Sequence, residues 1–284
     1  LASHKRQQEM LAKEEEFIAR FAARASHAAQ VQSRVKKIEK IERIEIPAEE
    51  RVVRFEFSEP PRSGDDVVVM DALAKQWPLP DGGVKPVFSG VSGIIKRQSK
   101  IAVVGVNGAG KSTFLKVLAG QTEPTSGTVA LGANVELGYF SQHAMEVLDP
   151  KKTVFDTVQD AMPLANRGVI MNLLGAFLFQ GDAVDKRIEN LSGGEKSRVV
   201  LATLLARPVN FLVLDEPTNH LDIRSREMLL NALQNFTGTV MLVSHDRHFL
   251  RCLVDRVIEV DHGEMRTYEG NYEYYLEKSH HFSH

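Results

Sequence analysis

The chain has 284 residues, of which 43% are hydrophobic and 25% are charged, and its formal net charge is −2. These proportions are typical of a soluble globular protein, and the length allows one or two domains with a real core. No apolar run is long enough to cross a bilayer, and the net charge gives no overall sign of nucleic-acid binding. The single cysteine, Cys252, excludes an internal disulfide, so we expect a reducing, cytoplasmic location.

Residues 1–46 are predicted to form a long helical arm that Pro47 ends. Apolar side chains recur every three or four residues and make a narrow stripe, which is typical of a coiled-coil seam and needs a partner helix. Residues 1–54 contain 12 Lys and Arg against nine Glu, so this part of the chain is basic. A solvated charged face explains this charge, and the functional alternative is an arm lying along phosphates.

A connector at residues 47–65 follows, with one short strand at residues 52–57, and a compact domain is expected at residues 66–278. The domain begins with a strand at Val67–Met70. A Pro- and Gly-rich loop is predicted at Pro78–Pro86, directly after Trp77.

Residues Gly105 to Ser112 fit the phosphate-loop pattern G-x-x-x-x-G-K-[ST]. The loop lies between a predicted strand, Ile101–Val104, and a predicted helix from Thr113, so its backbone N–H groups converge on a site that favours an anion. Lys111 is expected to reach the β- and γ-phosphates, and Ser112 to hold Mg²⁺. A Gly-rich turn that happens to carry Lys is the alternative. The residues assigned to phosphate binding are Asn107, Gly108, Ala109, Gly110, Lys111, Ser112 and Thr113.

The segment at about 144–200 changes character, because short helical patterns such as Val154–Met162 and Asn172–Phe179 replace the strand signal. Within it, Leu191–Lys196 is a second Ser- and Gly-rich loop that opens a helix and therefore offers a second anion site. A simple Ser N-cap at Ser192 explains the same residues. If this loop lies on a separate helical lobe, it binds a nucleotide held by another domain.

Asp215 and Glu216 follow the apolar strand Phe211–Leu214, at the sheet edge where α/β proteins bind ligands. Asp215 is placed to hold Mg²⁺, and Glu216 to orient or deprotonate an attacking water. His245 ends the strand Val240–Val243 and is a candidate γ-phosphate sensor. Gln142 ends another strand and is a candidate for Mg²⁺ or the water, although each of these residues alone is weak evidence.

Strands and helices alternate through the rest of the domain, which predicts a mainly parallel sheet covered on both faces. A helix at Arg226–Asn235, a hairpin about His262-Gly263, a helix at Tyr272–Lys278 and a tail at residues 279–284 complete the chain.

Taken in order, these motifs resemble the nucleotide-binding cassette of the ATP-binding cassette (ABC) superfamily over about residues 66–275. Asp215–Asp222 and Val243–Phe249 are similar to the non-transporter F subfamily of that superfamily, as are Gln32–Arg34 and Glu59–Gly64. The matching motifs are the phosphate loop Gly105–Thr113, the Q-loop at Gln142, the signature Leu191–Glu195, Asp215-Glu216, the D-loop Leu221-Asp222 and the switch His245.

The resemblance implies a parallel sheet core, an antiparallel β subdomain and a helical subdomain, preceded by the second half of a helical hairpin that joins two cassettes. It implies Mg-ATP binding and hydrolysis between two cassettes, the second being a missing N-terminal half or another copy. In that arrangement Ser192, Gly193 and Gly194 contact the ATP of the partner, and Asp222 crosses the interface. Trp77 stands where many members have an adenine-stacking Tyr, and the Pro/Gly insertion after it leaves a core Trp as the alternative.

In the F subfamily the hairpin contacts tRNA and ribosomal RNA on the ribosome, so the resemblance implies a translation factor. Two other functions stay open at this point. A basic helical arm also suits an ATPase acting on branched or damaged DNA. An energising subunit of a membrane transporter is disfavoured by the fused arm and by the lack of an apolar span.

Overall fold

The computed structural model describes three parts of the chain: residues 60–279, residues 28–39, and the single positions Met10, Lys13, Ile18 and Arg20. The chain divides into two compact units, residues 1–52 and 53–284. No helix among the described residues is long and apolar enough to span a lipid bilayer.

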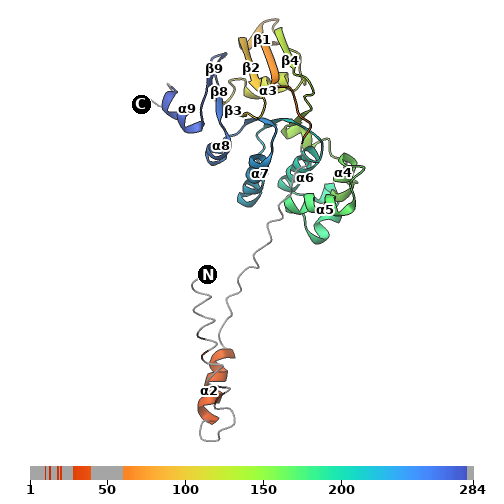
Figure 1. The fold of residues 1–284 in the computed structure, drawn as a ribbon, viewed down its shortest axis with the longest axis vertical. Coiled ribbons are helices and arrows are strands. Elements are labelled where there is room, and N and C mark those ends of the chain that lie inside the picture. The colour runs from red at the N-terminus through yellow and green to blue at the C-terminus, as the bar shows by residue number, and fades with distance from the viewer. Residues whose placement is uncertain are drawn as a thin grey trace. The chain divides into compact units, whose positions relative to one another are not determined.

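The first unit contains the helix α2 (Ala28–Glu39) (Figure 1). Lys36 and Lys37 lie in its last turn, where a cation interacts favourably with the helix dipole. The four single positions are also helical. The predicted arm is therefore helical where it is described, and the rest of residues 1–46, like the predicted strand at residues 52–57, lies outside the described residues.

A six-stranded sheet forms the centre of the second unit (Figure 1). Five neighbouring strands are parallel, and the edge strand β9 pairs antiparallel with β8. This confirms the mainly parallel core expected from the sequence. In spatial order the strands are β5 (Leu137–Phe140), β6 (Phe211–Asp215), β7 (Thr239–Val243), β3 (Lys100–Val104), β8 (Arg256–Asp261) and β9 (Glu264–Tyr268).

A three-stranded antiparallel sheet, in the order β2 (Val84–Lys96), β1 (Asp66–Pro78) and β4 (Ser126–Leu131), forms the expected β subdomain. The prediction of a loop over Pro78–Pro86 is wrong at both ends. Pro78 belongs to β1, and Pro86 of β2 pairs with Gln76. The turn is confined to residues 79–83 because the N–H of Leu79 donates to the carbonyl of Gly83. Pro86 is tolerated because β2 is an edge strand, which does not need every N–H for pairing.

The helices α4 (Val154–Ala161), α5 (Arg167–Ala176) and α6 (Gly193–Leu205) gather at one side of the second unit and form the expected helical subdomain (Figure 1). Here the prediction of a helix over Asn172–Phe179 is displaced. The helix α5 begins earlier because the side chain of Asn166 accepts a hydrogen bond from the N–H of Val169 and caps it. The helices of this unit are α3 (Lys111–Leu118), α4 (Val154–Ala161), α5 (Arg167–Ala176), α6 (Gly193–Leu205), α7 (Ile223–Asn235), α8 (Arg247–Leu253) and α9 (Tyr272–Lys278), with 3₁₀ turns η2 (Gln142–Met145), η3 (Gly181–Asp185) and η4 (Ile188–Asn190).

Alternate residues of the central strands enter two separate hydrophobic cores, one on each face of the sheet. Leu212 and Leu214 of β6 pack in the core that the helices α4 to α8 cover. Phe211 and Val213 pack in the other core, with α3 and β1. Because both faces are buried, β6 has a continuous apolar sequence rather than an alternating one. The sheet thereby presents the carboxyl ends of β3, β6 and β7 at one edge.

Candidate functional site

The loop at residues 105–110 joins β3 to α3, and residues from other strands pack closely against two of its glycines, Gly105 and Gly110. Gly105 has φ 147°, and a Cβ there would lie 2.3 Å from the carbonyl oxygen of Val260. Gly110 has φ 106°, and its Cβ would lie 2.4 Å from Cγ1 of Val87. A residue with a side chain at either position would have a strained backbone conformation, and its Cβ would overlap with the neighbouring atom. The backbone of the loop therefore lies unusually close to two other strands.

No side chain caps the N-terminus of α3, since Gly110 occupies the cap position. The first backbone N–H groups of the helix therefore have no side-chain acceptor, and the helix dipole places partial positive charge there. This geometry suits a phosphate group.

Lys111 begins α3, and its ammonium group turns back over the loop. Nζ donates to the carbonyl oxygens of Gly105 (2.9 Å) and Val106 (3.0 Å), and the side chain is buried. Burial lowers the pKa of Lys111, while the carboxylates of Glu216 and Asp215 oppose that shift. The cation is held within the loop, where it would meet a bound phosphate.

Ser112 and Asp215 join the phosphate loop to the end of β6. The hydroxyl of Ser112 donates to Oδ1 of Asp215 at 3.0 Å. Burial raises the pKa of Asp215, while this hydrogen bond and the charge of Lys116 oppose the shift. Hydroxyl and carboxylate oxygens are the donors that Mg²⁺ prefers. Ser112 and Asp215 thus supply two donors of this kind, and among the described residues no group of three or more His, Cys, Asp or Glu side chains is arranged to hold a metal ion.

Glu216 is strained and half enclosed. Its φ is 52°, and its N–H donates to the carbonyl of Val243 at 3.0 Å, which ties it to the end of β7. Oε1 lies 3.2 Å from Nε2 of His245, and Oε2 is buried with no hydrogen-bond partner in the described part of the protein. Burial raises the pKa of Glu216, Asp215 raises it further, and His245 opposes the shift. A carboxylate that binds protons more readily than an exposed one suits a group that takes a proton from water.

Ser192 and Glu195 form a complete capping box at the start of α6. The N–H of Ser192 donates to the carboxylate of Glu195 at 2.8 Å, and the N–H of Glu195 donates to the Ser192 hydroxyl at 3.2 Å. Gly194 packs against the carbonyl of His220, where an added Cβ would lie 2.7 Å away. The cavity of about 250 Å³ beside the phosphate loop is lined by Gly105, Lys111 and neighbours, with no residue of 192–195.

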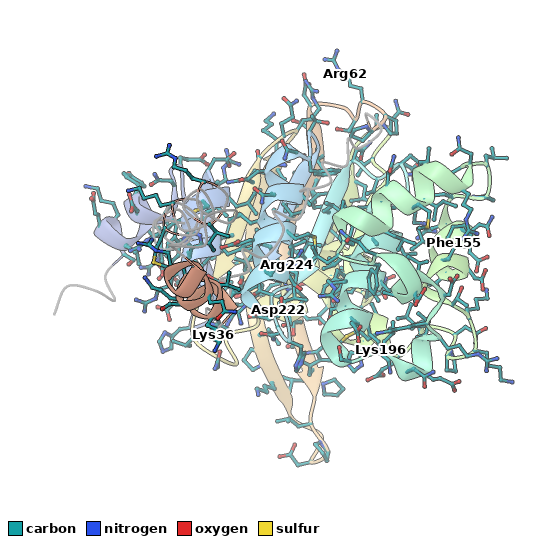
Figure 2. All side chains as sticks on the ribbon, turned by 90° about the horizontal axis from the view of Figure 1, so that it is seen from below. Lys36, Arg62, Phe155, Lys196, Asp222 and Arg224 are labelled. Atoms are coloured by element: carbon teal, nitrogen blue, oxygen red, sulfur yellow. The ribbon has the colours of Figure 1, made fainter. Side chains whose placement is uncertain are left out.

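The remaining predicted residues have distinct surroundings. Asp222 caps α7, since its carboxylate accepts the N–H of Ser225 at 2.7 Å. Hydrogen bonds from the side chain and then the backbone of Ser225 lower the pKa of Asp222. Figure 2 shows Asp222 and Arg224 together at the start of α7. Gln142 begins η2 after β5, and its side chain lies outside what the structure describes. Trp77 is 39% exposed near the end of β1.

Comparison with known proteins places the chain in a family. The family described as ABC transporter matches residues 88–219, and a second family with the same description matches residues 1–57. The chain is 40% identical over 279 residues to the ATP-binding protein YdiF of Bacillus subtilis (strain 168), covering 98% of this chain and 43% of YdiF. It is 41% identical over 281 residues to ABC transporter F family member 5 of Arabidopsis thaliana, covering 98% of this chain and 40% of that protein. The chain belongs to the ABC superfamily, and its relatives include ABC-F members.

Solved ABC structures share the fold of this cassette. An ATP-binding cassette solved as a dimer in a post-hydrolysis state with ADP and Pi has a TM-score of 0.61 and 21% identity, covering 71% of this chain and 98% of that one. A metal-chelate type ABC transporter in an inward-facing conformation has a TM-score of 0.57 and 20% identity, covering 72% of this chain and 83% of that one. The chain spans about two fifths of the length of the curated relatives it matches.

The sequence did not predict a role for two side chains, one near Asp215 and the other next to Trp77. Tyr139 lies on β5, opposite Val213 of β6, and burial and the charge of Asp215 raise its pKa to about 12. Lys75 lies on β1 with its Nζ 4.3 Å from the centroid of the Trp77 ring. Neither residue belongs to a short motif. Tyr139 is near Asp215 only in the folded chain, and the Lys75 ammonium is held by Thr122 and Glu123, which are distant along the sequence.

Proposed function

We propose that this cassette binds Mg-ATP and hydrolyses it together with a second cassette. The observation that carries the proposal is the convergence of Lys111, Ser112, Asp215 and Glu216 at one sheet edge, linked by the 3.0 Å Ser112–Asp215 bond. The choice of nucleotide is supported by a relative that is named as an ATP-binding protein and by a solved cassette of the same fold that is bound to ADP and Pi.

Each residue has a proposed task in this reaction. Trp77 stacks on adenine, the N–H groups of residues 107–113 bind the phosphates, and Lys111 neutralises their charge. Mg²⁺, held by Ser112, Asp215 and Gln142, would offset the charge on the phosphate oxygens. Glu216 accepts the proton of the attacking water.

His245 keeps the Glu216 carboxylate in place and contacts the γ-phosphate. Ser192, Gly193 and Gly194 bind the ATP held by the partner cassette, and Asp222 contributes across that interface.

On this proposal the nucleotide joins two similar cassettes, and hydrolysis releases them. Both cassettes bind the same γ-phosphate, so its removal weakens their contact and lets them separate. On this proposal a single chain does not form a complete ATP site, because its signature loop binds the ATP held by the partner cassette and not the ATP at its own phosphate loop. The rate of hydrolysis per chain should therefore rise with protein concentration.

A Glu216→Gln variant tests the assignment of the proton acceptor. We expect it to bind ATP and to lose hydrolysis by about 10²- to 10⁴-fold, the usual contribution of a general base. Glu227→Gln is the matched control, because Glu227 is an exposed acid on α7. Single-turnover hydrolysis of labelled ATP, with sedimentation velocity to measure dimer formation, gives both quantities. Hydrolysis by Glu216→Gln at the wild-type rate would contradict the role of Glu216, and a rate per chain independent of concentration would contradict the two-cassette site.

We further propose that the whole protein is a cytoplasmic translation factor whose arm contacts tRNA and ribosomal RNA. The relation to ABC-F members and the basic side chains of α2 support this choice. Lys36 and Lys37 are exposed on α2, and Figure 2 shows Lys36. A protein carrying Glu216→Gln should sediment with ribosomes in ATP, and the additional change of Lys36 and Lys37 to Glu should reduce this. Retention on branched DNA instead would favour a DNA-acting ATPase, and co-purification with a membrane permease a transporter subunit.

A further inference from the structure

Lys75 holds one face of the only tryptophan in the chain. The ammonium Nζ of Lys75 lies 4.3 Å from the centroid of the Trp77 ring, within the range of a cation–π interaction. Lys75 is 9% exposed, whereas Trp77 is 39% exposed. The face that the cation covers is therefore on the protein side, and the indole still has surface available to a flat ligand.

The position of the Lys75 ammonium is set by the segment that follows α3. Nζ donates to the hydroxyl of Thr122 at 3.1 Å and to the carbonyl oxygen of Glu123 at 2.6 Å. Among the described residues no carboxylate forms an ion pair with it. Its partners are thus two oxygens from the segment between α3 and β4, and an indole on the β1–β2 hairpin. Lys75 connects these two elements.

The same hairpin also contacts the phosphate loop. Val87 of β2 packs against Gly110, and Trp77 pairs with Lys85, two residues from Val87 along the strand. Two residues of an antiparallel strand span about 7 Å. The hairpin that carries the indole therefore also packs against the phosphate loop, as a site for a ligand with a base at one end and phosphates at the other requires.

Pairing irregularities on both sides of Lys75 accompany this arrangement. The register between β1 and β2 shifts between Leu73 and Lys75 and again between Lys75 and Gln76. Such irregularities redirect side chains relative to regular strand alternation. Leu73 and Lys75 are both buried, as alternate residues on one face of a strand are, so the long cationic side chain turns inward at a position where an apolar residue is usual.

We infer that Lys75 is a positioning residue for the purine of the nucleotide: its ammonium fixes the plane and distance of Trp77 relative to the phosphate loop. This inference rests on the proposed function, since it assumes that Trp77 stacks on adenine. A purine stacks best on a ring of fixed orientation, because ordering a mobile side chain lowers affinity. Lys75 therefore acts on base binding and leaves phosphate binding unchanged.

The test compares two probes on the Lys75→Met variant. ATP uses both the base and the phosphate sites, whereas inorganic tripolyphosphate uses only the phosphate site. Because the chain has one tryptophan, its fluorescence reports binding at the indole directly. We expect Lys75→Met to weaken ATP binding by about 2- to 30-fold, the range of a single cation–π interaction, and to leave tripolyphosphate affinity within about twofold. Lys75→Arg keeps the cation and should retain near wild-type ATP affinity.

Lys85→Met is the matched control, since Lys85 is an exposed lysine opposite Trp77 on the same hairpin. Unchanged ATP affinity in Lys75→Met, or equal loss of ATP and tripolyphosphate affinity, would overturn the inference. Equilibrium dialysis of labelled ATP with Trp77→Ala separates this failure from that of the base site itself. If Trp77→Ala binds ATP as tightly as the wild type, the indole does not stack on adenine and both proposals about the base fail. If only Trp77→Ala weakens binding, the base site stands and the role of Lys75 does not.

Discussion

Replacing Tyr275 with Phe removes one of two hydroxyl groups that hold a buried carboxylate beside the phosphate loop. Glu259 of β8 is 3% exposed, and its oxygens accept hydrogen bonds from Tyr268 (2.9 Å) and Tyr275 (3.0 Å). A hydrogen bond to a charged group contributes about 1.5–3 kcal/mol. For a unit of some 200 residues, each kcal/mol shifts Tm by about 2–4 °C, so Tyr275→Phe should lower Tm by about 3–12 °C.

Differential scanning calorimetry and urea unfolding measure this effect. Tyr274→Phe is the control on the same helix, because Tyr274 is 42% exposed, and it should change stability by less than about 0.5 kcal/mol. The double variant with Tyr268→Phe should lose more than the sum of the single changes, since the carboxylate is then left without either hydroxyl. Equal stability of Tyr275→Phe and Tyr274→Phe would refute the reasoning.

The same bond has a dependence on pH. Burial raises the pKa of Tyr275, and the hydrogen bond to Glu259 raises it further. A group whose pKa is raised by folding stabilises the fold below its ordinary pKa, about 10 for tyrosine, and this contribution is lost as the pH rises. The stability difference between wild type and Tyr275→Phe should therefore shrink above about pH 10.

Three further outcomes follow from the candidate site. Gly105→Ala should destabilise the protein by about 2 kcal/mol or more and abolish ATP binding, because its Cβ would meet the carbonyl of Val260. Gly93→Ala on β2 is the control, because its Cβ would meet nothing nearer than 3.8 Å, and equal effects of the two changes in urea unfolding would contradict this. Ser192→Ala should cost about 1 kcal/mol through loss of the α6 cap, whereas Ser192→Asn should retain most of the stability, and equal losses would argue against the cap. Burial raises the pKa of Asp215, so its stabilising contribution is present below about pH 4 and is lost as the pH rises through the raised pKa. Urea unfolding between about pH 4 and 7 should therefore show the wild type losing stability relative to Asp215→Asn. A difference in stability that stays constant with pH would contradict the shift.

Local sequence patterns predicted the elements whose identity depends on their own residues. The apolar run at Phe211–Leu214 became β6 because both faces of that strand are buried, and Tyr272–Lys278 became α9 with the predicted bounds. The predicted loop at Pro78–Pro86 failed because Pro and Gly were given their usual weight as strand breakers. An edge strand has no partner on one side, so β2 accommodates Pro86. The composition of a segment does not predict whether its strand lies at the edge or in the centre of a sheet.

The chemistry of the site was less predictable than its residue types. Acidic residues after a buried strand indicated Asp215 and Glu216, but the strained φ of Glu216 and its unpartnered Oε2 arise only where β6 meets β7. Lys75 had no motif, because its role comes from Trp77 on its own strand and from Thr122 after α3. Asp222 was expected only to cross the interface between cassettes, and its role as the cap of α7 emerges from the structure.

The phosphate loop is local in sequence, yet the residues that make its glycines necessary come from elsewhere in the chain. Gly105 is required by the carbonyl of Val260 on β8, and Gly110 by the side chain of Val87 on β2. Ser112 is held by Asp215 on β6. A well-packed interior transmits a small displacement rather than absorbing it. The loop is therefore in contact with β8, β2 and β6 together, and β2 belongs to the hairpin that carries Trp77.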